Sequence, residues 1–197
     1  VNRATEAERI EADARQFGAD VRMTSTDHAS GTDRLQEVAA QLALGEDDMV
    51  VNVQGDEPLI PPSVIDQVAQ NLANHADASI ATLCEPIEAI EQVRDPNAVK
   101  VVFDNQGYAL YFSRAPIPFC RDWQNEASAD MIPQGSDYYR HIGIYGYRVG
   151  LLNNFVRWPM SVLESTEKLE QLRAMSNGAR IHVAVTSTDV PPGIDTQ

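Results

Sequence analysis

Two carboxylates each follow an apolar run of the chain, where a parallel sheet would present them to a ligand. Asp56 comes directly after the run 49–53, and Asp195 follows the run 181–185 and a Pro-Pro-Gly turn. Open α/β sheets bind ligands at the carboxyl ends of their strands. Two carboxylates from different strand ends can hold one Mg²⁺ on a phosphate. A polar turn before Pro58 explains Asp56 equally well, and a helix N-cap is the more common role for a residue placed like Asp195.

The segment Ser-Gly-Thr-Asp-Arg, residues 30–34, joins a polar loop to the start of a predicted helix. Backbone N–H groups at such a start attract anions and carbonyl oxygens, and Gly31 lets a ligand approach the backbone. From this pattern alone we favour a plain N-cap over a ligand site.

The second half of the chain gathers basic and aromatic polar side chains: Arg114, Arg121, Arg140, His141 and Tyr145. Arginine binds carboxylates through a two-pronged hydrogen-bonded pair. A single histidine such as His141 is more often a structural hydrogen-bonding group than a catalyst. Glu170 and Gln171 are neighbours in a predicted helix whose apolar face is elsewhere, so we expect them on its solvated face.

Composition limits the partners of the protein. The chain has 197 residues and a formal net charge of −14, so a duplex nucleic acid is excluded as a partner. An anionic small substrate would require the few arginines to be concentrated at one site. No apolar run reaches the ~20 residues of a membrane span. Cys84 and Cys120 lack metal-type spacing and are typical of structural thiols in a reducing compartment.

The elements that must position these residues alternate between apolar and amphipathic runs, the pattern of an α/β sheet protein. An Asp-Asn-Gln-Gly turn at 104–107 predicts a hairpin, and Ser161 with Glu164 predicts a capping box. We interpret the irregular region 115–139 as a lid or dimer loop. The predicted helices begin near residues 10, 35, 62 and 162, and the predicted strands cover 20–23, 49–53, 79–83, 99–103, 108–112, 142–147 and 181–185.

Taken together, these segments resemble the 3-deoxy-manno-octulosonate (Kdo) cytidylyltransferases, also called CMP-Kdo synthetases. The resemblance extends over nearly the whole chain, in family order. The segments that carry it are DHASGTDRL (27–35), VNVQGDEPLI (51–60), NAVKVV (97–102), GYALYFSRAPIP (107–118), RHIGIYGYR (140–148), LEQLR (169–173), IHVAV (181–185) and IDT (194–196).

The resemblance implies a fold and a reaction. The fold is a mostly parallel, Rossmann-like nucleotidyltransferase sheet in one domain, 1–197, with an antiparallel dimerisation and sugar-binding insertion over about residues 97–150. The reaction converts CTP and Kdo to CMP-Kdo and pyrophosphate for lipopolysaccharide synthesis. The resemblance also implies Mg²⁺ as cofactor and a cytoplasmic homodimer, and it leaves Kdo and its 8-amino form as alternatives.

The resemblance also implies roles for single residues. Asp56 and Asp195 are the expected catalytic and metal-binding carboxylates. Ser30, Arg34 and Gln54 are expected at the nucleotide. The expected sugar-binding set is Arg114, Arg121, His141, Tyr145, Glu170 and Gln171.

The sequence departs from the family at both ends. It lacks the arginine-rich loop with a Pro-Gly-Lys element that grips the triphosphate, and it stops where the family continues into a last helix. We therefore expect a piece of a longer protein, and we expect these 197 residues by themselves not to form CMP-Kdo. A cytidylyltransferase for another sugar acid, such as sialic acid, is an alternative that the run RHIGIYGYR disfavours. A non-catalytic dimeric scaffold is the alternative from another class.

Overall fold

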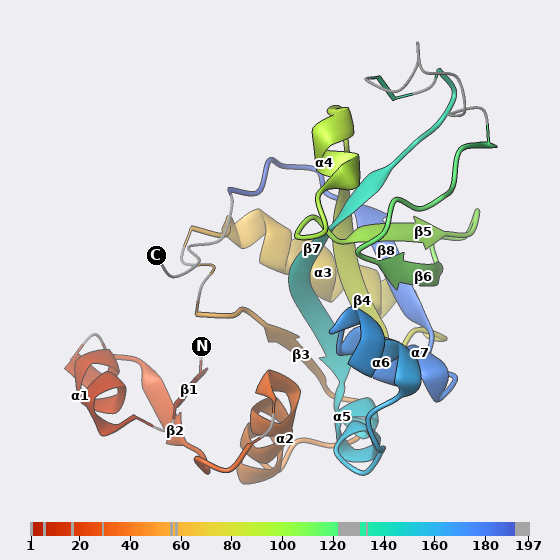
Figure 1. Ribbon diagram of the computed structural model, residues 1–197. Coiled ribbons are helices and arrows are strands. Elements are labelled where there is room, and N and C mark those ends of the chain that lie inside the picture. Colours follow the sequence, from red (N-terminus) through yellow and green to blue (C-terminus); the bar gives the residue numbers. More distant parts are fainter. Residues whose placement is uncertain are drawn as a thin grey trace. The chain divides into compact units, whose positions relative to one another are not determined.

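The computed structural model describes residues 2–5, 7–16, 18–28, 30–55, 57, 59–121, 131–132 and 134–191 (Figure 1). The chain divides into two compact units. Unit 1 comprises Val1–Asp48 and Arg148–Trp158, and unit 2 comprises Met49–Tyr147 and Pro159–Gln197. The single domain with an insertion over about 97–150 stays a prediction.

Unit 1 contains a two-stranded parallel sheet and its flanking helices. β1 (Asn2–Thr5) pairs with β2 (Asp20–Met23), and α1 (Glu8–Gln16) connects them. α2 (Gly31–Gln41) packs against α5 (Val149–Phe155), where Gln36 Nε2 donates to Asn153 Oδ1 at 3.1 Å. The predicted helix and strand at 10–23 are therefore confirmed, although Ile10 is 53% exposed and does not belong to the packed face.

Unit 2 is built on a six-stranded sheet. Five of its strands have the order β6-β5-β7-β4-β8, and the sixth, β3, pairs with β7. β4 and β8 are parallel, whereas the β4–β7, β5–β6 and β5–β7 pairs are antiparallel. The α/β class with a central sheet is confirmed: the described sheet is mixed, and each of these antiparallel pairs involves a strand of the predicted insertion. Its strands are β3 (Met49–Asn52), β4 (Ile80–Pro86), β5 (Lys100–Phe103), β6 (Ala109–Ser113), β7 (Tyr139–Arg148) and β8 (Ile181–Val185), and its helices are α3 (Pro62–Asn74), α4 (Ile90–Arg94), α6 (Val162–Glu167) and α7 (Gln171–Ser176).

β3 is less buried than its apolar sequence predicted. Met49 is 43% exposed and Val53 is 38% exposed, and the residues between them are half-buried. An apolar run has the same sequence whether one face of its strand is covered or both, so the pattern could not separate the two cases.

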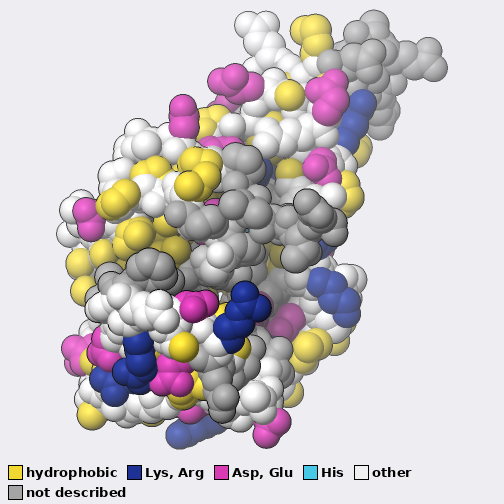
Figure 2. Space-filling view, turned by 90° about the vertical axis from the view of Figure 1, so that its left-hand side faces the viewer, with side chains coloured by type: hydrophobic (Ala, Val, Ile, Leu, Met, Phe, Trp, Pro, Cys, Tyr) yellow, Lys and Arg dark blue, Asp and Glu magenta, His cyan; other side chains and the backbone are white. Residues whose placement is uncertain are grey.

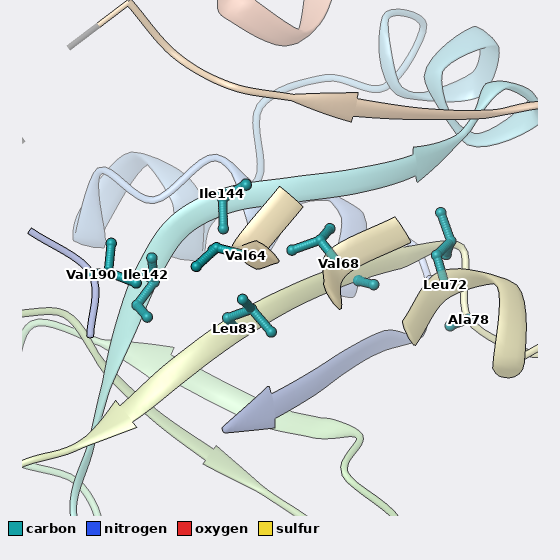
Figure 3. Close-up of a cluster of buried hydrophobic side chains, with 9 residues drawn as sticks. Val64, Val68, Leu72, Ala78, Leu83, Ile142, Ile144 and Val190 are labelled. Atoms are coloured by element: carbon teal, nitrogen blue, oxygen red, sulfur yellow. The ribbon is translucent and has the colours of Figure 1, made fainter. Parts of the chain in front are cut away.

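The main core of unit 2 lies between α3 and one face of the sheet (Figure 3). Val64, Val68 and Leu72 repeat at helical spacing and point at Leu83 of β4 and at Ile142 and Ile144 of β7. α3 approaches β7 so closely that a Cβ on Gly146 would lie 3.0 Å from Val68 Cγ1. This face of the sheet is therefore filled by α3.

A bulge in β7 decides which of its side chains lie on the face of the sheet opposite α3. Thr82 pairs with Tyr145 and the next residue, Leu83, pairs with Ile142, so β7 carries two extra residues at this point. Because two is one full strand period, residues on both sides of the bulge keep their faces. His141 and Tyr145 therefore share the face opposite α3 with Thr82.

Two local signals read from the sequence are confirmed. In the β5–β6 hairpin, Asp104 Oδ1 accepts from the backbone N–H groups of Gln106 (2.8 Å) and Tyr108 (2.9 Å), and Gly107 has φ +83°. The capping box of α6 has both of its hydrogen bonds between Ser161 and Glu164.

Both cysteines are free thiols, as expected for structural cysteines. Burial raises the pKa of Cys84 to about 12, with a smaller contribution from the charge of Glu85, so this thiol is inert at neutral pH. Of the helices in the described ranges, none is both long and apolar enough to cross a membrane.

Candidate active site

His141 lies on the face of the unit 2 sheet opposite α3 and is 9% exposed. Its ring packs edge-on against Phe112 at 5.0 Å and lies 5.2 Å from the ring of Tyr145, measured between ring centroids. Its Nε2 is 2.9 Å from Thr82 Oγ1. Burial, helped by the charge of Arg140, lowers the pKa of His141 to about 3. The imidazole is therefore neutral at physiological pH and serves as a hydrogen-bonding group.

Tyr145 and Glu170 join His141 on this face. Tyr145 stacks on Tyr147 with 5.7 Å between the ring centroids. Burial raises the pKa of Tyr145 well above its usual value, and the charges of Tyr147 and Glu170 raise it further. Tyr145 is therefore a neutral hydroxyl near the Glu170 carboxylate, so the structure brings His141, Tyr145 and Glu170 together.

Gln171 is the clearest correction to the sequence analysis. We expected it on a solvated helix face, but it is 8% exposed, and its Nε2 is buried without a hydrogen-bond partner among the described residues. The reason is the sharp corner between α6 and α7, where Lys168 adopts φ +56° and the short α7 turns its first residue inward. A buried amide lacking a partner is unfavourable, so Gln171 is a site that a polar ligand can complete.

The corner that holds Gln171 is fixed by an ion pair that the sequence analysis missed. Glu164 accepts from Arg173 through both carboxylate oxygens, at 2.8 Å from Nε and 2.5 Å from Nη2. The side chains are only 6% and 12% exposed. The capping box predicted Glu164 as a cap, but only the structure shows its second partner, Arg173, which lies in α7.

The two predicted sugar-binding arginines have different surroundings. Arg114 donates from Nε to the Glu167 carbonyl at 2.7 Å and from Nη1 to the Pro96 carbonyl at 2.9 Å. Its backbone N–H donates to Glu167 Oε2 at 2.9 Å. Its Nη2 takes part in none of these bonds and is left for a ligand. Arg121 is exposed, and its place at the sugar stays a prediction.

Lys100 is a buried cation beside Arg114 that sequence reasoning also missed. Its side chain is fully buried, and Nζ donates to the carbonyls of Asp95 (2.7 Å) and Ala98 (2.5 Å). Burial lowers its pKa, and the charge of Arg114 acts in the same direction. The available signal was a lysine inside the apolar run 99–103, which a surface strand would not need.

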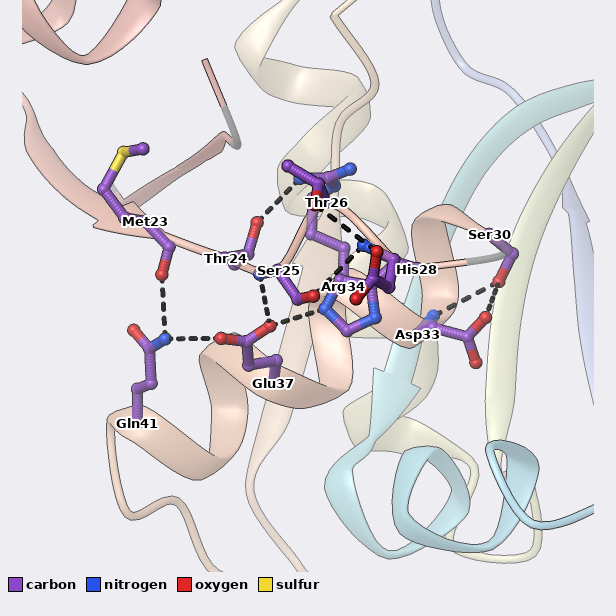
Figure 4. Close-up of polar contacts among 11 residues, drawn as sticks. Met23, Thr24, Ser25, Thr26, His28, Ser30, Asp33, Arg34, Glu37 and Gln41 are labelled. Atoms are coloured by element: carbon purple, nitrogen blue, oxygen red, sulfur yellow. Dashed lines mark hydrogen bonds and ion pairs between the residues drawn. The ribbon is translucent and has the colours of Figure 1, made fainter. Parts of the chain in front are cut away.

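The predicted nucleotide loop lies in unit 1 (Figure 4). Ser30 is the N-cap of α2: Oγ accepts from Asp33 N at 3.2 Å and donates to Asp33 Oδ2 at 3.0 Å. The N-cap interpretation is therefore confirmed. Arg34 Nη1 donates to Thr24 Oγ1 at 2.7 Å, which fixes this guanidinium beside the loop.

The same loop contains a histidine–carboxylate pair that was not predicted. His28 Nε2 lies 2.5 Å from Glu37 Oε2. Glu37 also accepts from the Ser25 backbone N–H at 3.0 Å and from Gln41 Nε2 at 2.9 Å. The bond from Ser25, followed by that from His28, lowers the pKa of Glu37. These bonds order the loop from Ser25 to His28 against α2.

The predicted metal carboxylates, Asp56 and Asp195, lie outside the described residues. Gln54, just before Asp56, is exposed in an irregular segment. Within the described ranges, no group of three or more His, Cys, Asp or Glu side chains is arranged to hold a metal.

Positive and negative side chains are mixed on the face that Figure 2 draws. On the face that Figure 2 draws, the described Lys and Arg side chains are scattered among Asp and Glu side chains instead of forming a continuous basic stripe. This distribution suits a small ligand held by single arginines better than a nucleic acid backbone.

Comparisons with known proteins give first a class and then a family. A family model described as cytidylyltransferase matches residues 2–181, so the chain is of the cytidylyltransferase class. It is 58% identical over 194 residues to the 3-deoxy-manno-octulosonate cytidylyltransferase of Cellvibrio japonicus and 57% identical over 195 residues to that of Saccharophagus degradans. Each comparison covers 98% of this chain and 76% of the relative. The chain therefore belongs to the 3-deoxy-manno-octulosonate cytidylyltransferase family.

Solved structures agree with this assignment. The structure of a CMP:2-keto-3-deoxy-manno-octonic acid synthetase complexed with CTP is 39% identical, with a TM-score of 0.87, and the match covers 100% of this chain and 75% of that one. A putative glucose-1-phosphate thymidylyltransferase from Bacillus anthracis is 14% identical with a TM-score of 0.54 and shares the fold alone.

Proposed function

We propose that the protein transfers CMP from CTP to the anomeric hydroxyl of Kdo, with release of pyrophosphate, as a step of lipopolysaccharide synthesis. The observation that carries the proposal is the identity of 56–58% over 98% of the chain with enzymes named for this reaction. The relatives favour this function over a cytidylyltransferase for another sugar acid and over a non-catalytic scaffold. A cytoplasmic homodimer is proposed on family membership alone.

The side chains on the face of the unit 2 sheet opposite α3 suit a polyhydroxylated sugar acid. His141 and Tyr145 are neutral hydrogen-bonding groups, and Gln171 Nε2 is a donor in need of an acceptor. Arg114 Nη2 and the exposed Arg121 supply positive charge for the sugar carboxylate. We assign the sugar to this face, with Glu170 as an acceptor for its hydroxyls.

The reaction requires positioning more than covalent help. The anomeric oxygen loses its proton and attacks the α-phosphorus of CTP in line, and the bond from phosphorus to the pyrophosphate oxygen breaks. The part of this chain is to hold the sugar so that its hydroxyl faces phosphorus. Ser30, Arg34 and Gln54 are proposed to bind the nucleotide, with Arg34 oriented by Thr24.

Mg²⁺ is the proposed cofactor, held by Asp56 and Asp195. Carboxylate oxygens are the donors that this hard cation prefers. When bound, the ion would neutralise charge on the phosphates. Ile60, four positions after Asp56, and Val190, five positions before Asp195, both pack on the core cluster around Val64.

The two carboxylates should behave as one unit. In the full-length protein, we expect Asp56→Asn and Asp195→Asn each to reduce the rate by ~10²–10³. The double variant should be little worse than either single variant. Rates across Mg²⁺ concentrations test this expectation, and near-normal activity of either single variant at low Mg²⁺ would contradict it.

Release of pyrophosphate from CTP tests the function itself. Purified protein, CTP and Mg²⁺ are combined with Kdo, with 8-amino-Kdo or with sialic acid, and the sugar nucleotide formed is identified by mass. Product from Kdo and none from sialic acid is expected, whereas product from sialic acid only would refute the proposal. That the 197 residues by themselves do not turn over stays a prediction, tested by the same assay on that polypeptide.

A further inference from the structure

Thr82 of β4 has no exposed surface, yet its hydroxyl lies in the middle of a polar cluster. Oγ1 is 2.7 Å from the Ile144 carbonyl oxygen, 3.1 Å from the Ile142 carbonyl oxygen and 2.9 Å from His141 Nε2. Ile142 directly precedes the two extra residues of β7, and Ile144 is the second of them, which is why two carbonyls of β7 meet a single side chain of β4.

The proton count at this hydroxyl leaves no proton for His141. Carbonyl oxygens only accept, and a threonine hydroxyl has one proton to donate and two lone pairs. An oxygen-to-oxygen distance of 2.7 Å requires that proton to lie between Thr82 and Ile144, because two bare oxygens would repel each other. The hydroxyl is then an acceptor toward His141, so Nε2 must be the protonated ring nitrogen.

We propose that Thr82 is a positioning residue that fixes His141 as the Nε2–H tautomer, so that its bare Nδ1 accepts a hydrogen bond from a hydroxyl of the sugar substrate. The described residues offer no hydrogen bond to Nδ1, and the ring is held by Phe112 and Tyr145. The low pKa of His141 keeps this acceptor bare at neutral pH. The sugar part of the inference rests on the proposed function, whereas the tautomer does not.

The consequence for recognition is that the proposed sugar site contains both hydrogen-bond donors and an acceptor that differ in what they can bind. Arginine and the Gln171 amide nitrogen are donors, which suit a carboxylate or a lone pair of the sugar. An unprotonated Nδ1 is a hydrogen-bond acceptor, so it can bind only a donor such as a hydroxyl group. His141 therefore selects for a hydroxyl at one position of the sugar and rejects an analogue without that proton, because an unpaired polar group would remain.

The tautomer can be measured without any substrate. We suggest two-bond ¹H–¹⁵N correlation spectra of the full-length protein labelled with ¹⁵N-histidine at pH 7. The chain has four histidines, and the His141→Gln variant assigns the signal. The expected result is a protonated Nε2 and an unprotonated Nδ1. A proton on Nδ1 in the wild type would overturn the inference, whatever the enzyme activity.

Variants separate the tautomer from strand packing. In Thr82→Val the Nε2–H loses its acceptor, so the fixed tautomer should be lost and the KM for Kdo should rise by about tenfold, the loss of one hydrogen bond. The KM for CTP should not change, and Thr82→Ser should restore both the spectrum and the KM. Leu83→Val is the matched control, since it weakens the same strand from the α3 side without touching His141.

Each alternative outcome would contradict a different part of the inference. An unchanged tautomer in folded Thr82→Val shows that Thr82 does not control the ring. A tautomer lost in Thr82→Val with no change in the KM for Kdo removes the acceptor role and, with it, the assignment of His141 to the sugar. A KM change that Leu83→Val reproduces would mean that packing, and not the hydroxyl, is responsible.

Discussion

Arg114 and Arg121 carry the same charge, but only Arg114 has a structural role in the described part of the fold. Three hydrogen bonds from Arg114 end on Glu167 and Pro96, so this residue ties the end of β6 to the end of α6. Although burial opposes it, bonds from Ser113 and the Arg114 backbone lower the pKa of Glu167, which keeps this anchor charged. Arg121 is exposed and has no such structural role.

Mutations of the two arginines should therefore affect different properties, stability for Arg114 and the KM for Kdo for Arg121. We expect Arg121→Ala to leave the melting temperature unchanged and to raise the KM for Kdo at least tenfold, because it removes charge offered to the sugar carboxylate. Arg114→Ala should lower the free energy of unfolding by about 1–3 kcal/mol, because the Glu167 and Pro96 acceptors lose their donor. Thermal melts and initial rates with each substrate varied in turn measure both effects. A defect of Arg121→Ala confined to CTP would place this side chain at the nucleotide.

Among the elements, the α6–α7 corner combines a cap, a left-handed residue and a buried ion pair. The capping box aims Glu164 inward, and Arg173 returns from α7 to meet it. Glu170 and Gln171 lie between these anchors in sequence, so the ion pair holds the segment that we propose to contact the sugar.

Breaking this pair from one side should be costly. Glu164→Gln leaves the Arg173 charge buried without its carboxylate, and we expect a loss of about 3–5 kcal/mol in the free energy of unfolding. The exposed pair of Arg180 and Asp77 is the matched control, since Asp77→Asn should change stability by about 0–1 kcal/mol. Urea denaturation of both variants measures the difference, and equal losses would show that burial does not decide the outcome.

The β5–β6 hairpin is held to β8 by a close backbone contact. Val183 N donates to the Gly107 carbonyl at 2.7 Å, and a Cβ on Gly107 would lie 2.8 Å from His182 Nε2 and 3.1 Å from the Val183 carbonyl oxygen. Gly178 has nearly the same φ, +81°, but nothing lies within 4 Å of its Cβ position.

These two glycines separate backbone strain from crowding. Gly178→Ala should destabilise the protein by about 1–2 kcal/mol through its left-handed backbone alone. Gly107→Ala should lose about 1–3 kcal/mol more, because the neighbours must also move. Chemical denaturation checks the difference, and similar losses would show that β8 gives way easily.

The elements that sequence reasoning predicted correctly are those decided by neighbours in the chain. Ser161 and Glu164 lie three positions apart, and the hairpin turn needs only Asp104 and Gly107. The misses depend on residues far along the chain: Arg114 meets Glu167 across 53 positions, and Gln171 is buried by a corner that its own helix does not encode. Helical periodicity predicts which residues share a face, but it does not predict what covers that face.

At the scale of the whole molecule, two buried histidines stand out in a chain of net charge −14. Burial lowers the pKa of His182 to about 4, with a further lowering by the charge of His75, against which its ring stacks at 3.5 Å. Asp104 acts in the opposite direction. His141 has a pKa of about 3. An acidic protein would ordinarily favour protonated histidine, so burial outweighs the overall charge at both rings.

These rings should make the protein sensitive to acid. Between their native pKa values and about 6.5, the value for an unfolded chain, the unfolded state binds protons that the native state does not. Stability is therefore complete above pH 6.5 and falls by about 1 kcal/mol per pH unit for each ring as the pH drops toward 4. Denaturation midpoints of the wild type and His182→Gln at pH 7, 6 and 5 test this, and the variant should show the shallower decline. Parallel declines would mean that His182 accepts a proton while folded.

The number of extra residues in the β7 bulge also decides which face of the sheet each later side chain of the strand occupies. His141 precedes the two extra residues and Tyr145 follows them, so both reach the same face only because the insertion is even in length. Loss of Gly143 alone would turn Tyr145 and Tyr147 into the space of α3 and bring Ile144 to the face that we propose for the sugar. Loss of Gly143 and Ile144 together would keep the faces but remove the Ile144 carbonyl, the nearer of the two acceptors of Thr82. In descent, this strand can therefore change length only in steps of two, and each step alters the hydrogen bonding of His141 before it alters the fold.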